Sequence, residues 1–321
     1  MEILEFHWDF QFEEYAVGAY SCQPKVLGHK SPADNIPERC REWTVLMVPK
    51  LAVCNFLSDV CALKRFAMMN GFSGVDWTLK VEDLPRSTAD ESPLLRQIAQ
   101  LHPLEVRYHL AFNGTDLGDS EIGNAHRAME IFRSACKLVS RLGGRYMTVH
   151  LGLGLDSTKG LSWERSLAAL AALVDYGKEL GVAVCLENLA WGWSSRPELF
   201  EKLVRKSRAG VTLDIGHAKV CSSVQSQAYT FEDFIAPHPD RVLNAHIYHE
   251  ECEDRHLPPQ QPNDLIDRLN VLSRLSCDWW VLELHEEPAL LSTLGMVNEY
   301  LATVPTQGHL PFTPAPFVLP E

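Results

Sequence analysis

Eight short apolar runs alternate with amphipathic stretches through most of the 321-residue chain, and this alternation constrains the fold more than any other feature. The runs are rich in Val, Ile, Leu and aromatic residues, whereas the stretches between them carry Ala, Leu, Arg and Glu at helical spacing. We predict strands at 45–56, 73–78, 105–111, 145–151, 182–187, 210–214, 242–248 and 279–284. Buried parallel strands that alternate with helices form a sheet whose outer face the helices cover. Eight such units predict an α/β chain folded as a (β/α)8 TIM barrel.

Helix boundary signals support this reading. We predict helices at 120–142, ended by Gly143 and Gly144, and at 162–180, opened by Ser162 and closed by Gly181. A doubly wound sheet is the alternative. No glycine-rich phosphate-binding motif follows the first strand to favour it.

The barrel accounts for residues 43–305, and the two ends of the chain look different. We expect residues 1–42 to form an extension packed on the barrel and residues 306–321 to form a Pro-rich tail. The acidic amino terminus does not resemble a secretory signal, and no apolar stretch approaches the ~20 residues of a membrane span. Nine cysteines without a CxxC pair read as free thiols, so we expect a cytoplasmic protein with no membrane partner.

Residue types that bind metals stand where predicted strands end. In order along the chain they are His109, His150, Glu187, Asp214, His246 and Glu283. Three more candidates follow in loops: His217, Asp254 and His256. Because the carboxyl ends of barrel strands converge on one face, these side chains can meet around one pocket. Imidazoles and carboxylates suit zinc, manganese or iron.

Each of these residues alone has an ordinary structural reading. A histidine at a strand end is often only hydrogen-bonded, Glu187 and Glu283 could begin helices, and Asp214 before the flexible Gly216 could form a turn. The acidic run EECED suggests a solvated loop around Asp254. As a set, these residues favour a metal site, because several buried carboxylates without cations would each cost several kcal/mol in desolvation. We therefore predict a site for one to three divalent ions, zinc or manganese.

Six short strings carry a family resemblance over residues 43–300: VHLGLG, CLENLA, TLDIGHA, NAHIYHEE, DRHLP and VLELHE. In combination they resemble the xylose isomerase-like TIM-barrel superfamily, which includes sugar isomerases, epimerases and endonuclease IV. The resemblance implies a central metal held by Glu187, Asp214, His246 and Glu283. It implies a second metal on His109, His150 and the bridging Glu187, and a third on His217, Asp254 and His256. The glycine that usually follows HLP in the family is absent from HLPPQQPND.

The number of ions separates two chemistries. One divalent ion against the three central carboxylates leaves one net negative charge, which suits a neutral sugar whose proton Glu187 and Glu283 would exchange as catalytic residues. Three ions against four carboxylates leave two net positive charges, which suits a phosphodiester. We expect a metal-dependent phosphodiesterase; a sugar or sugar-phosphate isomerase or epimerase, a lyase and a non-catalytic binding relative are the alternatives.

Net charge bears on the substrate. Lys plus Arg total 29 and Asp plus Glu total 42, for a formal charge of −13. Duplex nucleic acid is a poor partner for such a chain, because binding it depends on Lys and Arg. We therefore expect a small-molecule phosphodiester, and the superfamily's cobamide-remodelling phosphodiesterases are one group of this kind.

Several residues near the predicted ligands could shape the pocket. Trp191 and Trp193 follow Glu187 and could stack on a base or sugar, although core packing is the alternative. Residues that could orient the ligands are Tyr248, His249 and His285. Arg196 could bind a phosphate, but we expect an ion pair at a helix start.

Overall fold

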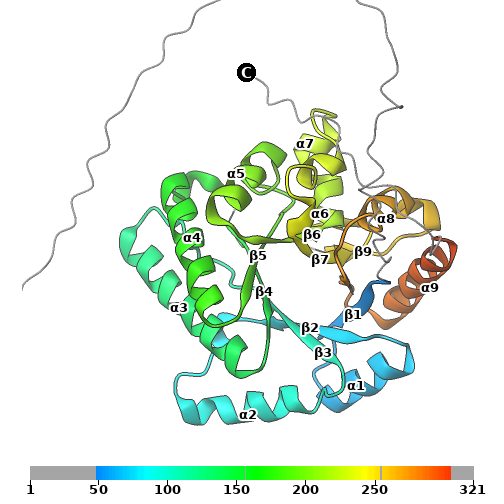
Figure 1. Ribbon diagram of the computed structural model, residues 1–321, viewed down its shortest axis with the longest axis horizontal. Coiled ribbons are helices and arrows are strands. Elements are labelled where there is room, and N and C mark those ends of the chain that lie inside the picture. The colour runs from blue at the N-terminus through cyan, green and yellow to red at the C-terminus, as the bar shows by residue number, and fades with distance from the viewer. Residues whose placement is uncertain (1–47, 156, 254, 305–321) are drawn as a thin grey trace, which may run out of the picture. The chain divides into compact units, whose positions relative to one another are not determined.

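Eight parallel strands close into a barrel in the computed structural model, which describes residues 48–155, 157–253 and 255–304. Neighbours around the barrel follow the order β1-β10-β7-β6-β5-β4-β3-β2, and every neighbouring pair is parallel (Figure 1). The strands are β1 (Lys50–Cys54), β2 (Gly74–Leu79), β3 (Glu105–Leu110), β4 (Tyr146–Val149), β5 (Ala183–Glu187), β6 (Gly210–Asp214), β7 (Val242–Ile247) and β10 (Trp279–Leu282). The predicted (β/α)8 TIM barrel is confirmed, and the doubly wound alternative is excluded by closure of the sheet.

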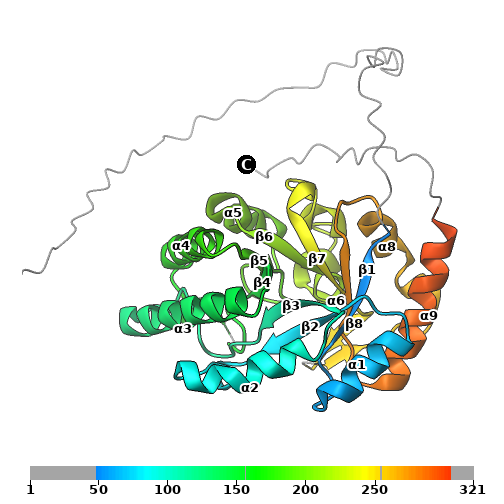
Figure 2. The same ribbon diagram turned by 60° about the horizontal axis from the view of Figure 1, so that its bottom comes forward.

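Helices surround the barrel, as Figures 1 and 2 show. They are α1 (Val60–Met69), α2 (Thr88–Ala99), α3 (Ile122–Arg141), α4 (Trp163–Glu179), α5 (Pro197–Ser207), α6 (Ile215–Val220), α7 (Ser222–Gln225), α8 (Ile266–Leu272) and α9 (Glu287–Thr303). A small antiparallel hairpin, β8 (Glu250–Cys252) and β9 (Arg255–Leu257), follows β7. None of the helices in the described ranges is long and apolar enough to cross a membrane. The expected extension (1–42) and tail (306–321) lie outside the described residues.

The predicted helix boundaries hold at both ends of α4. The Ser162 side chain caps the helix by accepting the Arg165 N–H at 3.3 Å, and Gly181 follows the helix with φ +72°. Helix α3 likewise stops before Gly143, whose φ is +78°. Short-range capping chemistry therefore sets these boundaries.

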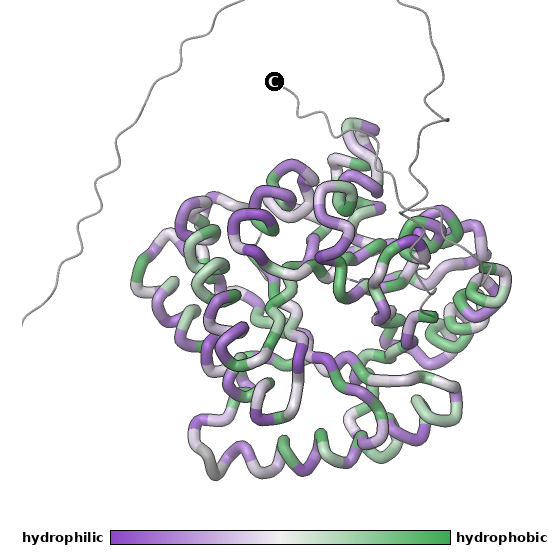
Figure 3. Tube along the Cα trace, viewed as in Figure 1, coloured by the Kyte–Doolittle hydropathy of each residue, from purple (hydrophilic) through white to green (hydrophobic). Residues whose placement is uncertain are grey.

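Alternation along the strands separates an apolar outer face from an inner face that carries the polar residues together with the small apolar cluster of Ala52, Trp279 and Val281. In β3, Val106, Tyr108 and Leu110 pack in the main core between strands and helices, whereas Arg107 and His109 belong to the alternate set. Figure 3 shows hydrophobic and hydrophilic colours alternating along the surrounding helices, as expected for one covered face. The site residues therefore face inward, because the residues that alternate with them along each strand face outward and pack in the apolar core.

Arg107 forms a polar floor inside the barrel, at the end opposite the candidate ligands. Its side chain is 3% exposed, and its guanidinium donates to Asn244 Oδ1 at 2.7 Å and to Asp278 Oδ1 at 3.0 Å. The guanidinium carbon also lies 3.9 Å from the Tyr146 ring centroid and 4.5 Å from that of Trp279. These contacts join β3 to the opposite side of the barrel.

We expect Arg107→Ala to lower the free energy of unfolding by about 3 kcal/mol, because it leaves the buried Asn244 Oδ1 without this donor and empties the space beside the Tyr146 and Trp279 rings. The matched control is Arg208→Ala, which removes an exposed ion pair with Asp175 and should cost less than about 1 kcal/mol. Urea unfolding followed by circular dichroism measures both. Equal effects of the two substitutions would show that the buried contacts of Arg107 stabilise the barrel no more than an exposed ion pair does.

Candidate metal centre

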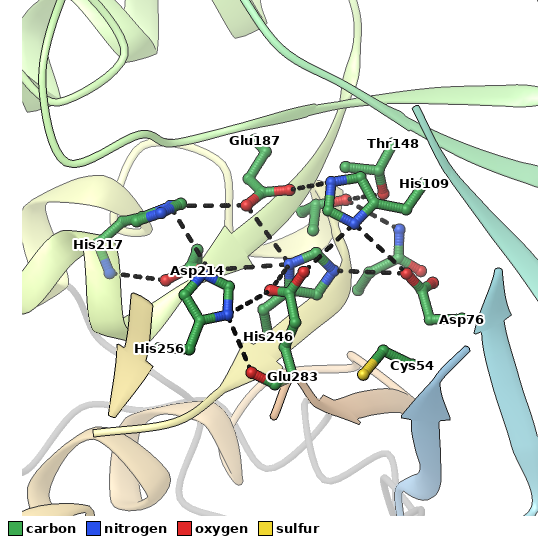
Figure 4. Close-up of polar contacts among 12 residues, drawn as sticks. Cys54, Asp76, His109, Thr148, Glu187, Asp214, His217, His246, His256 and Glu283 are labelled. Carbon is green, nitrogen blue, oxygen red and sulfur yellow. Dashed lines mark hydrogen bonds and ion pairs between the residues drawn. The ribbon is translucent and has the colours of Figure 1, made fainter. Parts of the chain in front are cut away.

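The carboxyl ends of the strands and the segments that follow them bring eight of the nine predicted ligands into one cluster, of which Figure 4 labels all but His150. Seven of them are buried, and His256 is half-buried. They are His109, His150, Glu187, Asp214, His217, His246, His256 and Glu283. Asp254, the ninth, lies outside the described residues. The convergence expected for a barrel therefore holds for every predicted ligand that the structure describes.

A central group contains Glu187, Asp214, His246 and Glu283, whose ligand atoms all lie within 4.8 Å of one another. His246 Nδ1 is 3.0 Å from Glu283 Oε2 and 3.4 Å from Glu187 Oε1. Asp214 begins α6, where its Oδ1 accepts the His217 N–H at 2.6 Å. Asp214 therefore does form the local backbone contact expected from the sequence, but only through Oδ1. Its Oδ2 faces the central group.

A second group shares Glu187 with the central one. His150 Nε2 lies 3.1 Å from both His109 Nε2 and Glu187 Oε2. Since Glu187 Oε1 faces His246 while Oε2 faces His150, one carboxylate lies between two sets of ligand atoms. Glu187 is therefore shared by the two groups.

A third group contains His217, Glu251 and His256. Glu251 pairs with His256 across the β8–β9 hairpin, and its Oε2 lies 3.4 Å from His217 Nε2. Glu251 was not among the predicted ligands, because the acidic run around it suggested a solvated loop. The signal for it was its place in a short hairpin opposite a predicted histidine.

Close packing links the two histidines of the third group. The Tyr248 ring stacks on His256, with centroids 3.9 Å apart and planes at 10°. The Tyr248 ring also meets Gly216 of α6, where an added Cβ would lie 2.1 Å from Cε2. Gly216 is therefore needed for close approach and not for the flexibility expected from the sequence.

Backbone carbonyls fix the ring orientation of three histidines. The Nδ1–H of His150 donates to Leu110 O at 3.1 Å, that of His217 to Asn188 O at 3.0 Å, and that of His256 to Glu283 O at 2.9 Å. Each ring therefore keeps Nε2 free toward the pocket, which is the tautomer that binds a metal.

The donor set fits metal ions. Buried polar atoms here have no hydrogen-bond partner in the described structure, and such atoms are costly unless something binds them. They are His109 Nδ1, Glu187 Oε1, Asp214 Oδ2, both ring nitrogens of His246, and Glu283 Oε2. Divalent ions in the central group would satisfy several of these atoms at once.

Without metal, the pocket balances its charge with protons. Burial would lower the pKa of His217, but Asp214, Glu251 and Glu187 raise that pKa to about 10. Burial acts on His246 in the same way, and Glu283 and Glu187 raise its pKa well above the usual value. Burial and the charges of Glu187 and Glu283 raise the pKa of Asp214 to about 6. Protonated imidazoles therefore supply the positive charge that metal cations would otherwise supply.

Asp76 is a further buried carboxylate that was not predicted. It lies on the inner face of β2, is 2% exposed, and has Oδ2 3.7 Å from His109 Nδ1. Strand ends alone do not reveal it, because β2 continues to Leu79. The sequence feature that could have revealed it is a charged residue between Val75 and Trp77, inside a buried strand.

The predicted tryptophans lie in different surroundings. Trp193 packs edge-on against Trp163, with centroids 5.2 Å apart, so the core-packing alternative describes it. Trp191 lies against Gly152 in the loop after His150, where an added Cβ would come within 3.3 Å of the indole. Trp191 remains a predicted substrate contact.

The residues predicted to bind phosphate or to orient the ligands make different contacts. Arg196 pairs with Glu198 at 2.5 Å at the start of α5, as expected. His249 Nε2 lies 2.6 Å from Lys219 Nζ, and His285 is exposed with Nδ1 3.7 Å from Cys54 Sγ. Among the three predicted orienting residues, Tyr248 makes the closest ring contact with a candidate ligand.

Comparison with known proteins gives a family match and a set of shared folds. A family model described as a xylose isomerase-like TIM barrel matches residues 65–299. The structure of a D-tagatose 3-epimerase-like protein is 17% identical, with a TM-score of 0.64 over 79% of this chain and 98% of that one. Endonuclease IV from Thermus thermophilus is 18% identical, with a TM-score of 0.55 over 79% and 99%. An uncharacterized protein of Methanocaldococcus jannaschii is 28% identical over 165 residues, which are 51% of this chain and 70% of that protein.

Metal binding should release protons from the metal-free protein. His217 and His246 have raised pKa values and hold protons near neutral pH, so a metal ion must displace them. We therefore expect Zn²⁺ affinity to rise with pH up to about pH 10, where His217 loses its proton, and proton release to accompany each titration. A pH-indicator dye in weakly buffered solution measures the release. Binding without proton release would contradict the charge balance described above.

Proposed function

Because the chain belongs to the xylose isomerase-like TIM-barrel family, we propose that it is a metal-dependent phosphodiesterase acting on a small-molecule phosphodiester. The observation that carries the proposal is the shared carboxylate of Glu187. Its two oxygens face different ligand groups, and His217 of the third group lies next to it, with Nδ1 3.6 Å from Glu187 Oε1. Adjacent groups of this kind suit several ions rather than one.

The buried charges favour more than one ion. Five carboxylates line the pocket in the described residues: Asp76, Glu187, Asp214, Glu251 and Glu283. Counting the carboxylates alone, one divalent ion would leave three negative charges for protonated imidazoles to balance, whereas three ions would leave one positive charge. The four carboxylates counted from the sequence included Asp254, so this balance is less positive than first expected. It still favours an anionic substrate over a neutral one when three ions bind.

Bound metal ions would activate water and stabilise developing negative charge on a phosphodiester. The chain's own residues supply the arrangement: Glu187 holds adjacent groups together, and carbonyl-fixed histidines keep one nitrogen directed inward. Trp191 lies at the loop after His150, where an indole can stack on a base or sugar. A net charge of −13 supports a small substrate over duplex DNA.

A sugar isomerase or epimerase is the second candidate. Glu187 and Glu283 both face His246 Nδ1, at 3.4 and 3.0 Å, so two carboxylates flank the central group. Solved neighbours named as a D-tagatose 3-epimerase-like protein and an L-ribulose 3-epimerase share the fold. A single central ion with proton exchange between the two carboxylates is the corresponding chemistry.

Metal stoichiometry distinguishes these candidates. Elemental analysis of protein purified and dialysed against Zn²⁺ should give about three equivalents for the hydrolase and about one for the isomerase. Protein without bound metal and without turnover would favour a non-catalytic relative. We expect about three equivalents.

His150→Ala should abolish cleavage of an aryl phosphodiester and remove about one metal equivalent, because it removes a ligand of the second group. His238→Ala is the matched control, since His238 pairs with Glu201 outside the pocket. Activity should be assayed with bis-p-nitrophenyl phosphate and with a nucleotide-bearing corrinoid. Undiminished cleavage by the His150 variant would overturn the polynuclear assignment.

A further inference from the structure

Two of the five candidate histidines lack the backbone contact that orients the other three. His150, His217 and His256 each place Nδ1 on a main-chain carbonyl. No such bond exists for His109 Nδ1 or His246 Nε2, and both atoms are buried without a hydrogen-bond partner in the described structure. Something else must set the orientation of these two rings.

One carboxylate oxygen faces both of these nitrogens. Asp76 Oδ2 lies 3.7 Å from His109 Nδ1 and 4.0 Å from His246 Nε2 (Figure 4). Both distances exceed a hydrogen bond by about 1 Å or less, which a small side-chain movement can close. The opposite nitrogens of the two rings face Glu187, at 3.6 Å for His109 Nε2 and 3.4 Å for His246 Nδ1.

We propose that Asp76 is a positioning residue that accepts from His109 Nδ1–H and His246 Nε2–H and so orients one imidazole in each of two neighbouring metal groups. The proposal rests on the metal-dependent function inferred above. A carboxylate behind a ligating histidine fixes its tautomer and increases its basicity. Here one carboxylate would do this for two groups.

Glu283 is the competing acceptor for His109, because its Oε1 lies 3.4 Å from Nδ1. Glu283 also belongs to the central group, where its Oε2 faces His246 Nδ1 at 3.0 Å. Glu283 therefore meets His246 on the nitrogen opposite Asp76. Among the described carboxylates, Asp76 alone faces both His109 Nδ1 and His246 Nε2.

Asp76 could instead hold an ion with His109 and His246, since their ligand atoms lie within 4.8 Å of one another. Such an ion would use the nitrogens that face Asp76. Both rings would then have to bridge two ions, with no N–H left on either. The positioning role requires only neutral imidazoles, so the geometry favours it.

The test is Zn²⁺ titration of Asp76→Asn against a chromogenic chelator. We expect affinity to fall about 10- to 100-fold for two of the bound ions while the third keeps its wild-type affinity, because His217, Glu251 and His256 do not contact Asp76. The visible spectrum of the Co²⁺-loaded protein should change as well, since the ligand field depends on histidine orientation. Asp278→Asn is the matched control: it alters a carboxylate bound to Arg107 at the barrel floor and should leave all affinities unchanged.

The outcomes separate this inference from the proposed function. Wild-type protein that binds no Zn²⁺ would overturn both. Wild-type binding of several ions with unchanged affinities in Asp76→Asn would overturn the positioning role alone, and loss of one whole equivalent at saturating Zn²⁺ would show that Asp76 is itself a ligand. Should Asp76→Asn fail to fold by circular dichroism, Asp76→Ser removes the carboxylate without adding an amide and is read by the same criteria.

Discussion

The desolvation of clustered charges is the constraint on which the rest of this structure depends. Five carboxylates and five imidazoles gather in one cluster toward the carboxyl ends of the strands. Bringing such groups out of water costs several kcal/mol each unless opposite charges compensate them. Without metal the compensation comes from protonated histidines, as the raised pKa values of His217 and His246 indicate. The same physics makes divalent cations the natural occupants.

The barrel can hold this cluster of charges because other residues form the apolar core that stabilises the fold. Alternate residues of each strand pack outward into one continuous apolar core with the helices, while the separate apolar cluster Ala52, Trp279 and Val281 is small. The remaining interior is polar, from Arg107 through Asn244 to Thr212 and Thr148, which are joined by hydrogen bonds of 2.7 to 3.0 Å. Functional side chains therefore occupy positions that the apolar core does not need.

Periodicity and strand ends predicted the fold and most of the pocket. All eight barrel strands follow from apolar runs. Six of the clustered ligands were predicted at strand ends, and His217 and His256 were predicted in the loops that follow. Asp76 and Glu251 did not follow, for different physical reasons. Asp76 stands inside a strand, so its inward direction depends on register, and Glu251 gains its place through the β8–β9 hairpin pairing that brings it opposite His256. Ring orientation was also beyond the sequence, because it depends on carbonyls from distant segments such as Leu110 and Asn188.

Tyr248 joins two segments that the chain order keeps apart. It rests on Gly216 in the helix that carries His217 and stacks on His256 from the hairpin. A methyl group at Gly216 would overlap the phenol ring that stacks on His256, and the same helix carries His217. The missing side chain at Gly216 is therefore what lets the helix and the hairpin approach each other through Tyr248.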